Sequence, residues 1–375
     1  MNFKKIIFII GTRPEAIKMA PLINQMKEVK DISVKVCLTS QHKELLQQAL
    51  HIFSIKEDHD LNLMQPNQTL AKFGSRALSA LDVYFLAEKP DWVFVHGDTS
   101  TALYASLAAY YHQIKVAHVE AGLRTFNKYS PFPEEINRTL IGSLATLHFA
   151  PTQLSKSNLL QENIKEQNII VTGNTVIDAV KETYKKILAG DLTVANEIKK
   201  LVIPRQTILI TMHRRENFGA GLHVICEAIK NLAIKYPSFN FIYPVHPNPN
   251  VKNPVETILG SQKNIFLIDP LNYVDFIFVM AASHIILTAS GGVQEEAPSF
   301  GKPVMVLREN TERPEAVDAG TVKLVGTNKD LIISEFIQLM ENQAYYTKMS
   351  EAINPYGDGQ ACGRIIDFFN QNSEA

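Results

Sequence analysis

Short apolar runs alternate with longer amphipathic stretches from one end of the chain to the other. The apolar runs have the length and composition of buried strands. They lie at 5–10, 33–39, 92–97, 115–120, 146–151 and 168–173, and then at 207–213, 240–245, 264–269, 284–289, 303–307 and 322–326. Between them, segments such as 101–113 and 222–236 carry apolar residues at helical spacing. This alternation predicts an α/β fold with parallel sheets and helices on both faces.

The alternation is interrupted at the charged segment 189–206. We therefore predict two Rossmann-like, doubly wound domains, 1–173 and 204–358, joined by a helical connection at 174–203. The final segment, 359–375, is predicted to be a helix that packs back onto the first domain. Sheets of this kind bind ligands beyond the carboxyl ends of their strands, so we expect the domains to face a central cleft.

Composition narrows the functional classes. Of the 375 residues 46% are hydrophobic, and the formal net charge is −1, which gives no general field to attract nucleic acid or an anionic membrane. No apolar run approaches the ~20 residues of a membrane span. Cys37, Cys226 and Cys362 are scattered and form no metal-binding pattern, as expected of a reduced, cytoplasmic protein. No HExxH or similar pattern indicates a metal.

The first predicted strand ends at Gly11, and a helix is predicted to begin near Pro14. Backbone N–H groups at a helix start favour an anion, and Arg13 and Lys18 add cations there. The alternative is a structural pair between Arg13 and Glu15.

A second anion-binding turn is predicted in the other domain. Ser290, Gly291 and Gly292 follow an apolar run, and glycines allow backbone N–H groups to approach a phosphate closely. Glu295 and Glu296 follow. One of these carboxylates binds a ribose diol, or, as the alternative, the two simply stabilise the first helical turn.

Cations follow two further strands of that domain. His213, Arg214 and Arg215 end the first of them, and Arg313 follows 303–307. Their position favours contact with a diphosphate over a solvated loop.

Carboxylates gather at strand ends in the first domain. Asp98 follows 92–97, where it either serves chemistry or caps the next helix. Glu120 ends 115–120, and a carboxylate there is costly unless it is paired or used. Glu134 and Arg138 stand four residues apart, as in a helical ion pair. The set is suitable for acid–base chemistry beside a diphosphate.

Several motifs together resemble one family, the non-hydrolysing bacterial UDP-N-acetylglucosamine 2-epimerases. They occur in the family's order over nearly the whole chain: GTRPEAIKMAPL, HGDT, HVEAGLR, PFPEEINR, TGNTVIDA, HRREN, YPVHPNPNV, SGGVQEEAPSFGKPV, TERPEA and NPYGDGQA. The resemblance implies two facing Rossmann-like domains in the glycosyltransferase-B arrangement, usually as a homodimer. It also implies interconversion of UDP-GlcNAc and UDP-ManNAc for surface polysaccharide.

The resemblance also implies site residues. The positions matched to UDP binding are Arg13, His213, Ser290, Gly291, Gly292, Glu296 and Arg313, with Glu296 on the ribose and the segment around Leu271 and Phe276 at the uracil. The positions matched to the sugar are Lys18, Asp98, Glu120, Glu134 and Arg138. In the family, UDP is eliminated to leave 2-acetamidoglucal and then returns, with no metal or nicotinamide. Asp98, Glu120, Glu134 and His213 are thus the expected catalytic set.

Two positions depart from the family pattern. Leu271 stands where some relatives carry a polar residue, so any uracil contact there is expected through the backbone. Some relatives bind substrate at a second, activating site, which Gln41, His42, Arg214 and His246 match. Asn67 stands where those relatives place an arginine, which argues against activation here.

Alternative functions remain open from the sequence. A glycosyltransferase of the same architecture would also bind a UDP-sugar, and fold cannot separate the two. A hydrolysing epimerase would release free ManNAc. A non-catalytic UDP-sugar sensor would bind without turnover.

Overall fold

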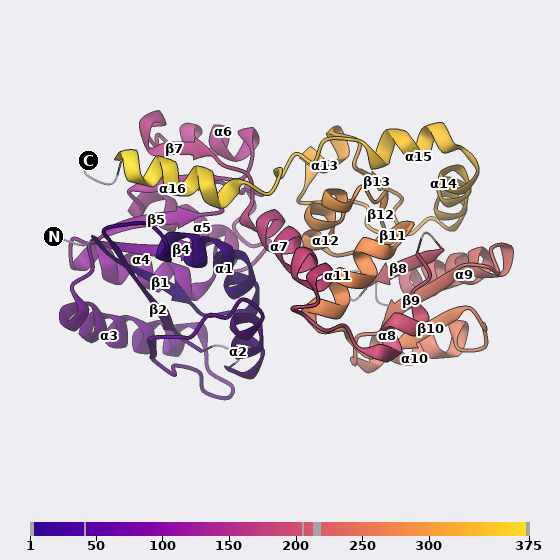
Figure 1. Ribbon diagram of the computed structural model, residues 1–375, viewed down its shortest axis with the longest axis horizontal. Coiled ribbons are helices and arrows are strands. Elements are labelled where there is room, and N and C mark those ends of the chain that lie inside the picture. Colours follow the sequence, from indigo (N-terminus) through magenta and orange to yellow (C-terminus); the bar gives the residue numbers. More distant parts are fainter. Residues whose placement is uncertain (1–3, 41–42, 205, 213–218, 373–375) are drawn as a thin grey trace. The chain divides into compact units, whose positions relative to one another are not determined.

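The computed structural model describes residues 4–40, 43–204, 206–212 and 219–372. The chain divides into two compact units (Figure 1). Unit 1 comprises Met1–Ala179 with Tyr356–Ala375, and unit 2 comprises Val180–Pro355. The last helix therefore belongs to the same unit as the first strand.

Unit 1 is built on a seven-stranded sheet in the order β3-β2-β1-β4-β5-β6-β7, with every neighbouring pair parallel. Its strands are β1 (Lys4–Ile10), β2 (Ile32–Leu38), β3 (His59–Asp60), β4 (Trp92–His96), β5 (Lys115–Val119), β6 (Leu147–Ala150) and β7 (Ile169–Val171). The order reverses between β1 and β4, which makes the carboxyl ends of these two strands the topological switch point.

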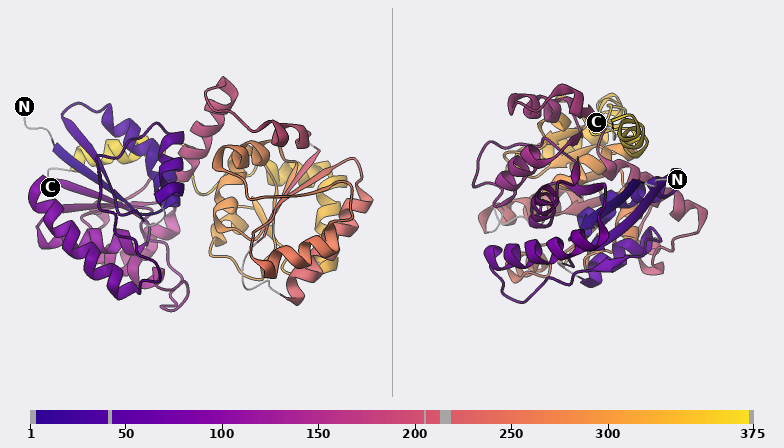
Figure 2. Two further views of the ribbon diagram at one scale, coloured as in Figure 1. Left: turned by 90° about the horizontal axis from the view of Figure 1, so that it is seen from below. Right: turned by 90° about the vertical axis from the view of Figure 1, so that its left-hand side faces the viewer.

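Helices cover both faces of this sheet, as Figure 2 shows. They are α1 (Arg13–Lys27), α2 (Lys43–Ile52), α3 (Leu70–Glu88), α4 (Ser100–Tyr111), α5 (Glu134–Leu144), α6 (Gln153–Gln161), the 3₁₀ turn η1 (Glu166–Asn168) and α16 (Ala361–Asn372). Helix α1 contacts α2 and α16, while α4 contacts α3 and α5. These groupings are expected when every crossover between parallel strands is right-handed.

The core of unit 1 lies between the sheet and its helices. Strand β1 is buried from Ile6 to Ile10, and β4 is buried throughout. Helix α16 contributes Phe369, whose ring meets those of Trp92 at 5.1 Å and Phe94 at 5.3 Å between centroids. The end of the chain is thus anchored by aromatic packing against the centre of the sheet.

Unit 2 repeats the design on a six-stranded parallel sheet in the order β10-β9-β8-β11-β12-β13. Its strands are β8 (Thr207–Thr211), β9 (Asn240–Pro244), β10 (Ile265–Ile268), β11 (Ile285–Thr288), β12 (Val304–Val306) and β13 (Val322–Leu324). Its helices are α8 (Asn196–Leu201), α9 (Ala220–Lys235), α10 (Pro249–Leu259), α11 (Tyr273–Ala282), α12 (Gly291–Glu296), the 3₁₀ turn η3 (Ala297–Phe300), α13 (Pro314–Asp318), α14 (Lys329–Glu341) and α15 (Gln343–Ser350). Helix α7 (Thr175–Ala189) carries the chain from unit 1 into unit 2.

The predicted α/β fold with two parallel sheets is confirmed. Each predicted apolar run overlaps one strand, whereas β3 was missed. Its two polar residues pair with Cys37 and Leu38, and they carry no apolar signal. In the part of the chain that is described, no helix is long and apolar enough to cross a membrane.

Candidate active site

The turn after β1 is held together by a carboxylate of its own helix. Thr12 caps α1 and forms a capping box with Glu15. The Glu15 carboxylate accepts hydrogen bonds from Gly11 N (3.0 Å), Thr12 N (2.7 Å) and Thr12 Oγ1 (2.8 Å). The expectation that backbone N–H groups at this helix start face a ligand is therefore wrong for Gly11 and Thr12, because Glu15 already engages them.

The alternative expectation, a structural pair between Arg13 and Glu15, does not describe the main role of Glu15. Its carboxylate is engaged by the turn before α1 and by Thr99. Its carboxylate is 2% exposed and accepts a further hydrogen bond from Thr99 Oγ1 at 2.6 Å. Burial raises the pKa of Glu15, and the hydrogen bonds from Thr99, Thr12 and Gly11 oppose that rise. The T-x-x-E signature was present in the sequence and could have identified this capping role.

Glu120 is the centre of a polar cluster at the switch point, which consists of Lys18, Asp98, Glu120 and Arg138. Its backbone is left-handed, with φ of 62°. Its Oε2 forms an ion pair with Lys18 of α1 and accepts a hydrogen bond from Asn174 Nδ2 at 2.7 Å. The Nε2 atom of His96 lies 3.7 Å from the same oxygen. Because left-handed backbone is uncommon for a non-glycine residue, Glu120 occupies a conformation that the surrounding structure must hold in place.

Asp98 follows β4 and forms an ion pair with Arg138 of α5. It does not cap α4, because Thr99 does: Thr99 Oγ1 accepts a hydrogen bond from Ala102 N at 3.0 Å. Burial raises the pKa of Asp98, and the charge of Arg138 opposes that rise. The structure thus brings Lys18, Asp98, Glu120 and Arg138 together at the carboxyl ends of the central strands.

Glu134 is the first residue of α5, and it is partly exposed. Besides Asp98, Arg138 pairs with Glu135, at 3.3 Å, rather than in the expected i,i+4 ion pair with Glu134. Glu135 was missed from the sequence. Its buried carboxylate accepts hydrogen bonds from Thr125 N at 3.0 Å and Phe126 N at 2.8 Å, and so fastens the loop between β5 and α5.

Three buried histidines lie on adjacent strands beneath this cluster. His118 on β5 is the register partner of His148 on β6, and His96 ends β4. Burial lowers the pKa of His96 to about 4, of His118 to about 3 and of His148 to about 4. His118 Nε2 donates to the carbonyl of Gly97 at 2.7 Å. No local pattern marked these residues, because strand pairing brings them together.

In unit 2, the switch point lies between β8 and β11. The hydroxyl groups of Thr211 and Thr288, which end these strands, are 2.6 Å apart. Ser290 N donates to Thr288 Oγ1 at 2.9 Å, and Ser290 is the N-cap of the short helix α12. Gly291 and Gly292 open that helix, so the predicted glycine turn lies at this strand end.

The two carboxylates of α12 have different surroundings. Glu295 is buried and pairs with Nε of Arg313, which is the N-cap of α13. Glu296 is partly exposed, and its Oε1 lies 3.5 Å from where a Cβ on Gly292 would stand. Because Glu295 belongs to the same short helix as Gly291 and Gly292, its ion pair holds Arg313 near the glycine turn.

Leu271 lines a pocket of about 620 Å³ in unit 2. The loop that carries it precedes α11, whose N-cap Asn272 accepts a hydrogen bond from Asp275 N at 2.9 Å. Asp275 in turn accepts from Ala195 N at 2.9 Å. Phe276 is partly exposed in the first turn of α11 and does not line this pocket.

The residues matched to a second site are only partly described. Gln41, His42, Arg214 and the predicted catalytic His213 lie outside the described residues. His246 is exposed after β9, and its Nδ1 accepts a hydrogen bond from Asn248 N at 3.1 Å. Asn67 is exposed with φ of 55°, a conformation that asparagine tolerates better than most residues.

Comparison with known proteins decides the family. The family model described as UDP-N-acetylglucosamine 2-epimerase matches residues 24–370. The UDP-N-acetylglucosamine 2-epimerase of Escherichia coli O157:H7 is 51% identical over 372 residues, which span 98% of this chain and 99% of that protein. The chain belongs to the UDP-N-acetylglucosamine 2-epimerase family. An epimerase is an isomerase, so this assignment places the chain among the isomerases.

Solved structures of family members have the same architecture. The UDP-GlcNAc 2-epimerase of Neisseria meningitidis, bound to UDP-GlcNAc, is 51% identical with a TM-score of 0.88, over 98% of this chain and 100% of that one. The Methanocaldococcus jannaschii enzyme, in complex with UDP-GlcNAc and UDP, is 34% identical with a TM-score of 0.79, over 98% and 100% of the two chains.

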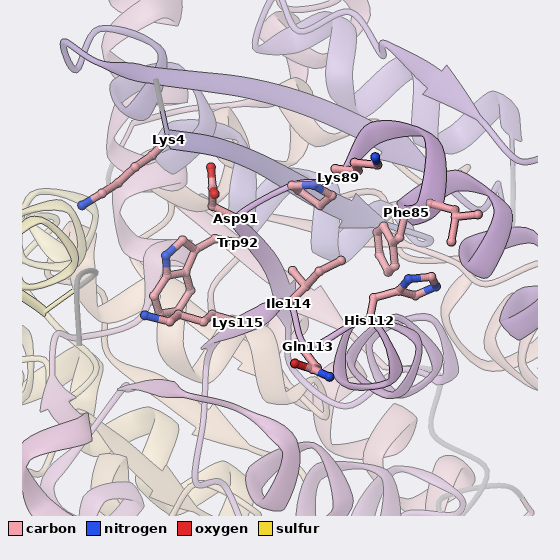
Figure 3. Close-up of a pocket in the computed structure, with 11 residues that line it drawn as sticks. Lys4, Phe85, Lys89, Asp91, Trp92, His112, Gln113, Ile114 and Lys115 are labelled. Atoms are coloured by element: carbon pink, nitrogen blue, oxygen red, sulfur yellow. The ribbon is translucent and has the colours of Figure 1, made fainter. Parts of the chain in front are cut away.

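A large hollow in unit 1 of this epimerase-family chain lies away from the polar cluster. It has a volume of about 630 Å³ and is lined at the amino ends of β1, β4 and β5 by Lys4, Trp92 and Lys115 (Figure 3). The switch-point cluster stands at the opposite, carboxyl edge of these strands. Within the described ranges, no group of three or more His, Cys, Asp and Glu side chains could hold a metal ion.

Proposed function

We propose that this chain interconverts UDP-GlcNAc and UDP-ManNAc by eliminating UDP and adding it back. In the first half-reaction the C2–H and C1–O bonds break, and a C1–C2 double bond forms in 2-acetamidoglucal. In the second half-reaction UDP returns to C1, and C2 takes a proton on the opposite face. The reaction therefore needs a base, an acid and cations beside the departing diphosphate.

The observation that carries the proposal is the cluster at the switch point of unit 1. Asp98 and Glu120 are two carboxylates in different surroundings, one paired with Arg138 and the other with Lys18. Pairs of carboxylates in contrasting environments are the usual source of acid and base in one site. Glu134 is proposed as a third carboxylate of the set, and His213 as a catalytic histidine.

We propose that unit 2 binds the nucleotide. The glycine turn Ser290–Gly292 approaches the diphosphate, Glu296 takes the ribose, Arg313 contributes a cation, and the Leu271–Phe276 segment holds the uracil. In unit 1, Arg13 contributes a further cation for the diphosphate, and Lys18 and Arg138 lie on the sugar side. Relatives solved with UDP-GlcNAc or UDP support a UDP-sugar as ligand.

We further propose a cytoplasmic homodimer that supplies ManNAc units for surface polysaccharide. Exposed apolar side chains on the adjacent helices α3 and α4 support a second copy as partner: Val83, Leu86, Tyr110 and Tyr111 are 59–69% exposed. Sedimentation of the wild type and Leu86→Glu tests this: a dimer that dissociates in the variant supports it, and a monomeric wild type contradicts it.

Proton NMR in heavy water tests the activity. The enzyme is mixed with UDP-GlcNAc alone. Appearance of UDP-ManNAc with deuterium at C2 of the sugar is the expected result. A substrate that keeps its C2 proton would point instead to a transferase or a sensor, and release of free ManNAc and UDP would point to a hydrolysing epimerase.

A further inference from the structure

Two sequence motifs that the proposed mechanism leaves unused meet where the chain passes between its units. The segment 172–179 leads out of unit 1, and 354–361 leads back into it. Asn174 N donates to the carbonyl of Tyr356 at 2.7 Å. A Cβ on Gly173 would stand 3.2 Å from that carbonyl oxygen and 3.3 Å from Gly357 Cα. We call these paired segments the crossing.

The crossing is fastened further along by charged side chains. The buried Asp178 of α7 accepts hydrogen bonds from Ala361 N at 3.2 Å and Cys362 N at 3.0 Å, at the start of α16. Arg364 donates from Nη1 to the carbonyl of Thr172 at 3.1 Å. The outgoing and returning segments are therefore one hydrogen-bonded structure, and every link between the units along the chain runs through it.

Asn174 connects this structure to the polar cluster of the site. Its side chain is 2% exposed, and its Nδ2 donates to Glu120 Oε2 at 2.7 Å. Its Oδ1 accepts a hydrogen bond from Val176 N at 3.1 Å, in the first turn of α7. One amide thus joins the crossing, a helix start and the carboxylate of Glu120.

We propose that Asn174 is a positioning residue that holds the Glu120 carboxylate from the crossing. Lys18 pairs with the same oxygen from α1, but its stem has several rotatable bonds. The amide of Asn174 is short and is fixed by its own hydrogen bonds, so it defines the direction of Glu120 more tightly. This inference rests on the proposed function only in assigning chemistry to Glu120.

Three substitutions separate the contact with Glu120 from the other duties of Asn174. Asn174→Ser keeps a side-chain oxygen that can accept from Val176 N but cannot reach Glu120. Asn174→Asp keeps the acceptor and places a negative charge against the carboxylate. Asn174→Ala removes both contacts. Asn158→Ala is the matched control, because Asn158 is also buried and donates to Gly122 O at 2.9 Å without an observed hydrogen bond to Glu120.

The kinetic readout is kcat, KM and the pH profile of epimerisation. For Asn174→Ser we expect kcat to fall on the order of 10- to 100-fold, the usual effect of misplacing a reacting group, with KM for UDP-GlcNAc within about threefold. Loss of a donor to the charged form makes Glu120 easier to protonate, so its limb of the profile shifts to higher pH. The shift should be larger in Asn174→Asp, and Asn158→Ala should show none.

A second readout does not depend on activity. The carbon-13 signal of the Glu120 carboxylate, identified by its loss in Glu120→Gln, is titrated in wild type and variants. A higher titration midpoint in Asn174→Ser and Asn174→Asp supports the proposal even if the wild type fails to epimerise, which would overturn the proposed function alone. Midpoints and pH profiles equal to those of the wild type and Asn158→Ala would overturn the role of Asn174.

Discussion

The Glu15 carboxylate accepts a hydrogen bond from the Thr99 hydroxyl at 2.6 Å, and this contact joins the turn after β1 to the turn after β4. The first turn carries Arg13, and the second carries Asp98. Because Glu15 also binds Gly11 N and Thr12 N, it fixes the backbone from which the Arg13 side chain extends. The start of α1 thus carries a carboxylate of the same helix against its N-terminal dipole, and the N–H groups of Gly11 and Thr12 are already hydrogen-bonded to it.

Replacing Glu15 should lower stability in a graded way. Glu15→Ala leaves buried donors unsatisfied, so we expect the free energy of unfolding to fall by about 1–3 kcal/mol. Glu15→Gln can keep its oxygen toward Thr12 and offer its NH₂ to Thr99, so the loss should be smaller. Chemical denaturation checks both, with Glu28→Ala, at the exposed other end of α1, as control. Equal losses in all three variants would contradict the capping role.

The two carboxylates of the cluster should matter for turnover rather than for nucleotide affinity. Asp98→Asn or Glu120→Gln removes a proton-transferring group, so we expect kcat to fall by about 100- to 10,000-fold. UDP affinity, measured by calorimetry, should stay within a few-fold. Asp91→Asn is a suitable control. Asp91 immediately precedes β4, whereas Asp98 follows it, and Asp91 accepts a hydrogen bond from Lys5 N at the amino ends of the strands. Full activity in both cluster variants would remove these residues from the mechanism.

Arg13→Ala should weaken UDP binding. A guanidinium hydrogen-bonded to a diphosphate contributes about 1.5–3 kcal/mol, so the dissociation constant should rise by roughly 10- to 150-fold. Lys27→Ala, which removes a cation from the exposed far end of the same helix, should leave binding unchanged. Titration calorimetry with UDP distinguishes the two. An unchanged constant for Arg13→Ala would show that Arg13 does not contact the nucleotide.

The order of apolar runs predicted the fold because buried parallel strands are continuous hydrophobic segments. The same order predicted that residues after β1, β4 and β5 would meet, since the carboxyl ends of parallel strands share one edge. Lys18, Asp98 and Glu120 do meet there. Their individual catalytic and binding roles stay predictions.

Contacts that depend on tertiary packing could not be predicted in this way. The spacing of Glu134 and Arg138 suggested a local pair, but Arg138 pairs with Asp98, 40 residues away in sequence, and with Glu135. Asn174 follows β7 and donates to Glu120, 54 residues away in sequence, which no local pattern could indicate. Short-range sequence patterns do not indicate which carboxylate forms the ion pair when several surround one cation.

The buried histidines of unit 1 should make its stability depend on pH. The pKa of His96 and His148 is lowered to about 4 and that of His118 to about 3, because burial disfavours the charged imidazole. In the unfolded chain a histidine has a pKa of about 6.5. Below that pH these histidines bind protons in the unfolded state but stay neutral in the folded state. The free energy of unfolding therefore falls as the pH is lowered toward 4.

We expect the melting temperature to change little above pH 7 and to fall steadily below about pH 6.5. Each histidine contributes a slope of up to about 1.4 kcal/mol per pH unit in that window. His148→Gln should flatten the slope, whatever it does to stability at pH 7, because one proton-binding difference is removed. His223→Gln, which alters an exposed histidine of α9, should leave the slope as in the wild type. A wild-type slope in His148→Gln would show that His148 is protonated alike in the folded and unfolded states.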